Sequence, residues 1–130
     1  MIVGGAQENT LFTLRGHLEN GHDAVLVTGP SPGPEGELLE LAELDGVSVV
    51  TCPHLQRALS PTRDLKAYLW LKGYFRSQPF DLVHTHSSKA GILARKAAHR
   101  AGVPVVVHTI HGLPFHPYES WWRNRLYIIA

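Results

Sequence analysis

The chain alternates short apolar runs with amphipathic stretches, and this alternation limits the folds open to it. Residues 23–28, 47–51, 82–85 and 105–109 have the length and composition of buried strands. Strands that alternate with helix-length segments form parallel sheets, because each crossover helix returns the chain to the same end of the sheet. The pattern therefore predicts an α/β fold, a Rossmann-like parallel sheet with helices on both faces.

The segments between these runs have the periodicity of amphipathic helices. Leucines recur on one face of residues 6–20, and Gly21 follows as a terminator. Ser60 and Pro61 predict an N-cap with proline at the first helical position. We expect the helices at residues 6–20, 35–44, from 61 onward, 89–101 and 118–130.

Composition points to one soluble domain. The chain has 130 residues, of which 44% are hydrophobic and 18% charged. No apolar run approaches about 18 residues and no basic-then-apolar leader is visible, so we expect neither a transmembrane span nor a signal peptide. Cys52 is the one cysteine, which excludes an internal disulfide and fits a reducing compartment. These features predict a cytoplasmic protein.

The net charge of +1 conceals an asymmetry between the two halves. Residues 1–65 carry nine acids and three bases, net −6, whereas residues 66–130 carry two acids and nine bases, net +7. A basic half suits nucleic acid, anionic lipid or a phosphorylated ligand, but these bases are spread over several helices, which favours solvated surfaces. No stripe of bases and aromatics is typical of nucleic-acid binding, so nucleic acid is not an expected partner.

Two histidines end the predicted strand at 82–85, before a small-residue turn and a helix. Ligands of open parallel sheets bind outside the carboxyl ends of the strands. His84 and His86 share one face because they are two residues apart, and Thr85 faces the other way. We interpret His86 as the ligand-contacting ring, a hydrogen-bond donor or acid/base, and His84 as a buried ring satisfied by the backbone.

The residues after this strand and the next add polar groups. Ser87 and Ser88 offer two candidate N-caps, and Lys89 has an ammonium able to meet a phosphate or a sugar hydroxyl. His111 is followed by Gly112. This pair is consistent with a loop that lines a ligand site, and equally with a loop histidine that faces solvent.

Gly4 and Gly5 precede the first helix and form a plausible anion cradle, since free N–H groups at a helix N-terminus favour negative charge. The third glycine of a dinucleotide-binding motif is absent, and a simple tight turn is an equal alternative. Gln7, Glu8 and Asn9 follow on the first turn and are able to bind a hydroxyl-rich ligand.

A metal site is an alternative use of the histidines. His84 and His86 place two imidazoles side by side, and His108, His111 and His116 lie in the next strand and loop, as in a metal-dependent hydrolase. Against this, no acid follows in the turn after His86. Nucleophile-elbow and Walker A sequences are absent, as are paired carboxylates in the basic half.

In this order and spacing, several short motifs resemble the N-terminal domain of family 4 glycosyltransferases, which have the GT-B fold. The resemblance covers nearly the whole chain and rests on residues 4–10, 21–23, 27–30, 81–91 and 108–112.

The resemblance implies transfer of a sugar, with retention of anomeric configuration, from a nucleotide sugar (UDP- or GDP-linked) to a saccharide or lipid-linked acceptor, as in polysaccharide biosynthesis. It implies two Rossmann-like domains facing each other across a cleft, the N-terminal one binding mainly acceptor. The fold is usually metal-independent, so no metal and no cofactor beyond the co-substrate are expected.

The same resemblance assigns the candidate site residues. Gly4 and Gly5 become the loop near the donor diphosphate, and His86 becomes the catalytic histidine beside the transferred sugar. The implied acceptor-binding residues are Gln7, Glu8, Asn9, Lys89 and His111.

Two parts of the family pattern are not found in this sequence. Only Ile2 and Val3 match the first strand, and the C-terminal donor-binding domain with its E-x7-E motif is missing. We therefore expect residues 1–130 to be a partial domain, truncated at both ends and inactive alone. A non-catalytic carbohydrate- or nucleotide-binding module is a further alternative. Trp121, Trp122, Arg123 and Arg125 suggest a peripheral contact with the inner face of the membrane.

Overall fold

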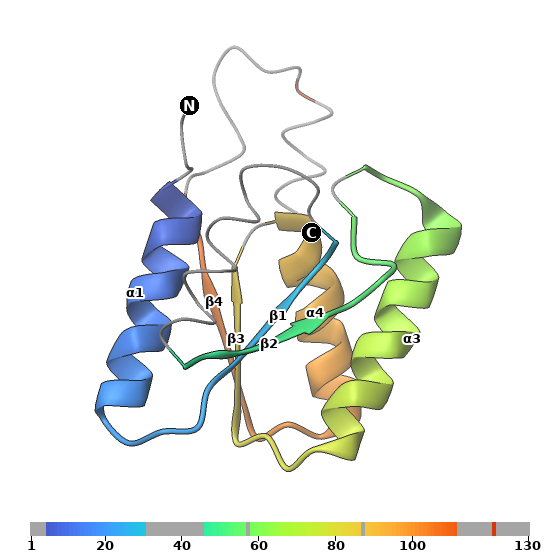
Figure 1. The fold of residues 1–130 in the computed structure, drawn as a ribbon. Helices are drawn as coiled ribbons and strands as arrows, with labels where there is room; N and C mark the ends of the chain where they lie inside the picture. Colours follow the sequence, from blue (N-terminus) through green and yellow to red (C-terminus); the bar gives the residue numbers. More distant parts are fainter. Residues whose placement is uncertain (1–4, 31–45, 57, 87, 112–120, 122–130) are drawn as a thin grey trace.

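The computed structural model describes residues 5–30, 46–56, 58–86, 88–111 and 121 (Figure 1). In chain order the elements are α1 (Gly5–Glu19), β1 (Val25–Thr28), β2 (Ser48–Thr51), α3 (Pro61–Ser77), β3 (Leu82–His86), α4 (Ser88–Ala101) and β4 (Val105–Thr109). All four predicted strands are present, as are three of the predicted helices. The helices expected at 35–44 and 118–130, and the strand remnant at Ile2 and Val3, lie outside the described residues.

The strands pair in parallel, as the alternation predicted. β1 pairs with β2 in the register Val25↔Ser48, and β3 pairs with β4 in the register Leu82↔Val105. Within the described residues these are two two-stranded sheets. Because paired parallel strands end at the same edge of a sheet, the C-terminal ends of β3 and β4, His86 and Thr109, lie side by side.

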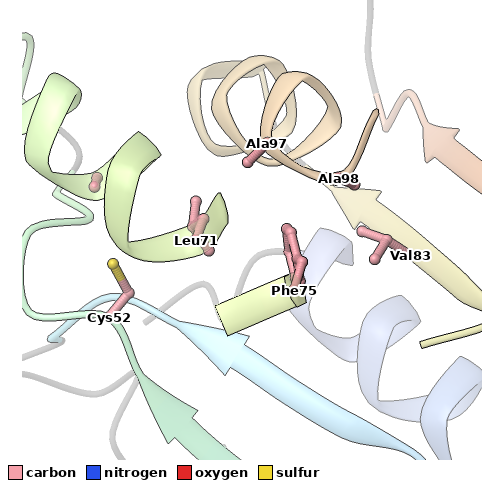
Figure 2. Close-up of a cluster of buried hydrophobic side chains, with 7 residues drawn as sticks. Cys52, Leu71, Phe75, Val83, Ala97 and Ala98 are labelled. Atoms are coloured by element: carbon pink, nitrogen blue, oxygen red, sulfur yellow. The ribbon is translucent and has the colours of Figure 1, made fainter. Parts of the chain in front are cut away.

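One hydrophobic core joins the two strand pairs. Figure 2 shows side chains from α3, α4, β3 and the residue after β2 pointing toward one another. Leu71 and Phe75 of α3 are buried, and burial of each stabilises the fold by about 1.5–3 kcal/mol. The fully buried Ala97 and Ala98 let α4 lie close to its neighbours. The buried members of this core are Cys52, Ala67, Leu71, Phe75, Val83, Ala97 and Ala98.

Helices cover both faces of the β1–β2 pair. Val27 packs against the core under α3 and α4, whereas Leu26 packs with Leu11 of α1 and Val47. Successive side chains of a strand point to opposite faces, so α1 lies on the face opposite α3 and α4. The prediction of a parallel α/β fold with helices on both faces is confirmed.

Glycines end two of the helices. Gly21 after α1 and Gly102 after α4 have φ of +78° and +86°. The N–H of His22 donates to His17 O at 3.0 Å, and the N–H of Gly21 donates to Leu18 O at 2.9 Å. This pair of bonds is a Schellman motif, which requires the left-handed conformation that glycine adopts without strain.

Candidate functional site

Three histidine rings form a row where β3 and β4 end. The ring centroids of His84 and His86 are 4.3 Å apart, as expected for one face of a strand. His111, just beyond β4, stacks on His86 with a centroid separation of 5.2 Å. Nδ1 of His86 lies 2.9 Å from Nε2 of His111. The structure thus confirms the shared face of His84 and His86 and brings His111 beside them.

His84 bonds to a side chain and not to the backbone group that we expected. Its Nε2 lies 2.7 Å from Oγ1 of Thr109. Thr109 is the register partner of His86, so it sits on the same face of the neighbouring strand. A hydroxyl and an imidazole each donate or accept, which leaves this pair satisfied in either tautomer.

The surroundings of His84 and His86 disfavour their charged forms. Burial is the largest cause of the lowered pKa of His86, and together with the neighbouring His84, His111 and His108 it brings that pKa to about 4. Burial also lowers the pKa of His84, with smaller contributions from His17, His108 and His111. At neutral pH His84 and His86 therefore offer hydrogen bonds to a ligand without adding positive charge.

The opposite face of β3 carries a second polar contact. Oγ1 of the buried Thr85 lies 3.1 Å from Val107 O and 2.9 Å from Nδ1 of His108, and that Nδ1 lies 3.1 Å from Thr85 O. Carbonyl oxygens only accept, so the Thr85 hydroxyl donates to Val107 and Nδ1 of His108 carries a proton. His108 is therefore separated from the row by the strand itself.

α4 packs directly beneath His108. Gly91, in its first turn, is buried, and a Cβ at this position would lie 2.7 Å from Cε1 of His108. No side chain fits there unless the ring moves. Sequence reasoning did not single out Gly91; a glycine in an otherwise alanine-rich helix was the available signal.

Lys89 contacts the connection between β2 and α3 and the first turn of α3. Its Nζ lies 2.9 Å from Gln56 O and 2.5 Å from Oδ1 of Asp64, and it also contacts Ala58 O. Sequence reasoning missed Gln56 and Asp64 as partners, because neither lies near Lys89 in the chain.

The first turn of α1 lies at the end of the molecule where β3 and β4 finish (Figure 1). The helix starts at Gly5; Glu8 and Asn9 are exposed and Gln7 is half-buried. His17, farther along α1, is near enough to His84 to affect its pKa. Gly4 lies outside the described residues.

Comparison with known proteins decides the family. Residues 4–130 match the family described as "Glycosyl transferase 4-like domain". The chain belongs to the glycosyl transferase 4-like family. Over 85 residues it is also 48% identical to a UDP-Gal:alpha-D-GlcNAc-diphosphoundecaprenol alpha-1,3-galactosyltransferase of Escherichia coli. That segment is 65% of this chain and 21% of the relative, so the chain spans about a fifth of the relative's length. No solved structure matches the chain.

Membership of the glycosyl transferase 4-like family confirms the resemblance seen in the sequence. Within this domain, the described part of the chain contains no group of three or more histidine, cysteine, aspartate or glutamate side chains arranged to hold a metal ion. The metal-hydrolase alternative therefore gains no support from the arrangement of His84, His86, His108 and His111; His116 lies outside the described residues.

Helix α3 of this glycosyl transferase 4-like domain carries exposed leucines and exposed bases, which we call the α3 stripe. On α3, Leu65 and Leu69 are 58% and 54% exposed, and Lys66 and Arg76 are exposed beside them. Trp121 is exposed too, while Trp122, Arg123 and Arg125 lie outside the described residues. No helix among the described residues is long and apolar enough to cross a membrane.

Proposed function

We propose that this chain supplies the acceptor-side wall of a retaining enzyme that transfers a sugar from a nucleotide sugar to a saccharide or lipid-linked acceptor. The observation that carries the proposal is the His84–His86–His111 row at the ends of two parallel strands. The name of the Escherichia coli relative specifies a UDP-galactose donor and an acceptor on diphosphoundecaprenol. By that relation we favour a UDP-sugar over a GDP-sugar, and a lipid-diphosphate acceptor over a free saccharide.

His86 is the residue that we propose to contact the reacting sugar. Because Nδ1 is bonded to His111, Nε2 is the ring atom left to face a ligand. A neutral imidazole is able to donate to or accept from a sugar hydroxyl, whereas a pKa of about 4 makes His86 a poor proton donor at neutral pH. Its contribution to rate is therefore the positioning of the sugar.

The start of α1 is the proposed approach of the donor diphosphate. The N–H groups at this end carry partial positive charge, and Gly5 lets the backbone come close to a phosphate. Gln7, Glu8 and Asn9 then face acceptor hydroxyls, together with His111. The donor nucleotide itself is proposed to bind a second Rossmann-like domain in the whole protein, so transfer requires more than the residues of this chain.

We propose that the stripe on α3 meets the membrane that holds the acceptor. Leucines interleaved with lysine and arginine are typical of helices that lie at a lipid interface. Leu65 and Leu69 are able to enter the headgroup region while Lys66 and Arg76 meet anionic lipid. We therefore propose that the protein is cytoplasmic and works at the inner face of the membrane.

The test is a transfer assay with the full-length protein, a panel of UDP- and GDP-sugars, and a lipid-diphosphate acceptor. We expect the double variant His86→Ala, Gly5→Val to lose about a hundredfold or more in turnover, because both the sugar and the diphosphate are misplaced. His99→Ala, on the exposed far end of α4, is the matched histidine control. Full activity in the double variant would show that the site is elsewhere.

Two further measurements separate the alternatives. A metal-dependent hydrolase would retain zinc, manganese or iron after metal-free purification and re-addition, as measured by elemental analysis. A non-catalytic binding module would bind a nucleotide sugar in calorimetry without turnover in the same preparation.

A further inference from the structure

The ammonium of Lys89 has a complete set of partners inside the protein. Its acceptors are Gln56 O at 2.9 Å, Oδ1 of Asp64 at 2.5 Å, and Ala58 O. The two carbonyls take two of the three donors of the ammonium, and the carboxylate balances its charge as an ion pair. The ammonium of Lys89 is thus bound to the segment that leads from β2 into α3.

This placement is unfavourable for an ordinary surface lysine. A cation in the first turn of a helix opposes the helix dipole, and α4 has no acid in that turn to offset it. The side chains of Lys89 and Asp64 are only 20% and 21% exposed, so both charges are largely removed from water. Such a pair costs desolvation, which the contacts to two carbonyls and a carboxylate offset.

Asp64 connects the Lys89–Asp64 ion pair to the start of α3. Its Oδ2 accepts the N–H of Ser60 at 3.2 Å, while its own N–H donates to Ser60 O at 2.7 Å. The Ser60 hydroxyl itself makes no capping bond. One carboxylate therefore holds the beginning of α3 with one oxygen and the beginning of α4 with the other.

The first turn of α4 in turn supports the histidine site. Gly91, two residues after Lys89, packs against the ring of His108. His108 bonds to Thr85, which stands between His84 and His86 on β3. A shift of this helical turn would move His108 and, through Thr85, the strand end that carries His86.

We propose that Lys89 is a positioning residue and not an acceptor contact: with Asp64 it fixes the first turn of α4 against His108 and so sets the position of His86. This inference rests on the proposed function only in taking His86 as the residue that meets the sugar. The physical coupling from Lys89 to His108 is independent of any reaction.

The kinetic test uses Lys89→Met, Asp64→Asn and the double variant in the full-length protein, with acceptor titrated at saturating donor. We expect each single variant to lower kcat by about ten- to a hundredfold with acceptor KM changed less than twofold. The double variant should be no worse than the worse single variant, because both remove one interaction. Lys89→Arg should restore part of the rate.

An acceptor contact gives a different pattern. Lys89→Met would then raise acceptor KM, Asp64→Asn would leave the kinetics unchanged, and the two effects would add. This pattern would overturn the proposal. Lys96→Met is the matched control, since Lys96 is an exposed lysine of the same helix that lies over Tyr68, outside the site.

A structural readout separates this inference from the proposed function. We expect the imidazole NMR resonances of His108 and His86 to shift in Lys89→Met and Asp64→Asn but not in Lys96→Met. If they shift in a protein that transfers no sugar, the positioning role stands and the proposed function fails. If they stay in place in folded variants, the positioning role is wrong. Asp64→Asn provides the same readout should Lys89→Met fail to fold.

Discussion

Nδ1 of His86 lies 2.9 Å from Nε2 of His111, so two residues that are 25 positions apart share one hydrogen bond. One ring must donate and the other accept, so two neutral rings share the same tautomer: both carry the proton on Nδ1 if His86 donates, or both on Nε2 if His111 donates. The proton positions of the two rings are therefore coupled through this bond.

The first prediction concerns stability against pH. Because the fold lowers the pKa of His86 from 6.5 to about 4, the unfolded chain binds more protons between these values, and stability must fall as pH falls. The contribution is fully present above about pH 6.5 and lost through about pH 4; His84, whose pKa is also lowered, acts in the same direction. Urea unfolding midpoints from pH 7 to pH 4 would measure it.

His86→Asn is the control for that titration, because it keeps a hydrogen-bonding side chain without a titrating ring. We expect its stability profile to be flatter over the same range. Identical slopes in the two proteins would show that the pKa of His86 is not lowered in the fold.

The second prediction concerns Gly91. Gly91→Ala places a Cβ 2.7 Å from His108, so the ring or the helix must move. Overpacking of this kind costs about 1–3 kcal/mol of unfolding free energy, and transfer activity should fall with it. Gly73→Ala, in α3 with nothing within 4 Å of the new Cβ, should instead raise stability by about 0.5–1 kcal/mol. Thermal unfolding of both variants compares them.

The third prediction concerns the Thr85 hydroxyl. Thr85→Val keeps the shape but leaves Val107 O without this donor and removes one acceptor of the His108 Nδ1–H. Loss of a buried bond partner costs about 1–3 kcal/mol, measured by urea denaturation. Thr85→Ser keeps the hydroxyl and should recover most of that free energy. Equal stability of the valine variant and the parent would contradict the assigned bonds.

The fourth prediction concerns the α3 stripe. The double variant Leu65→Gln, Lys66→Glu in the full-length protein should bind vesicles of phosphatidylglycerol at least about fivefold more weakly, with binding that weakens in salt. Both side chains are exposed, so folding should be unaffected. Arg100→Glu on α4 is the charge control, and co-sedimentation is the measurement. Equal weakening by Arg100→Glu would assign the effect to net charge alone.

Local patterns were enough to predict the strands, the helix ends and the shared face of His84 and His86. Each of these depends on residues close together in the chain: an apolar run, a glycine after a helix, or two residues on alternate strand positions. The same alternation placed Thr85 on the far side of β3, as observed.

The contacts that build the site depend instead on sheet register and helix packing. His108 faces away from the row because it pairs with Thr85 in register, which no local pattern specifies. Lys89 was expected to meet a ligand, but its distance from Asp64 is set by how α3 and α4 pack. The close approach of Gly91 to His108 has the same origin.

The two strand pairs, finally, share a core without sharing a backbone ladder in the described residues. Cys52, next to β2, and Val83 of β3 belong to one buried cluster with Leu71 of α3. A smaller residue at 71 would leave a cavity in this cluster, and truncation of a buried leucine to alanine costs about 2–5 kcal/mol. A leucine of a helix thus helps to hold together two strand pairs that do not bond to each other in the described residues.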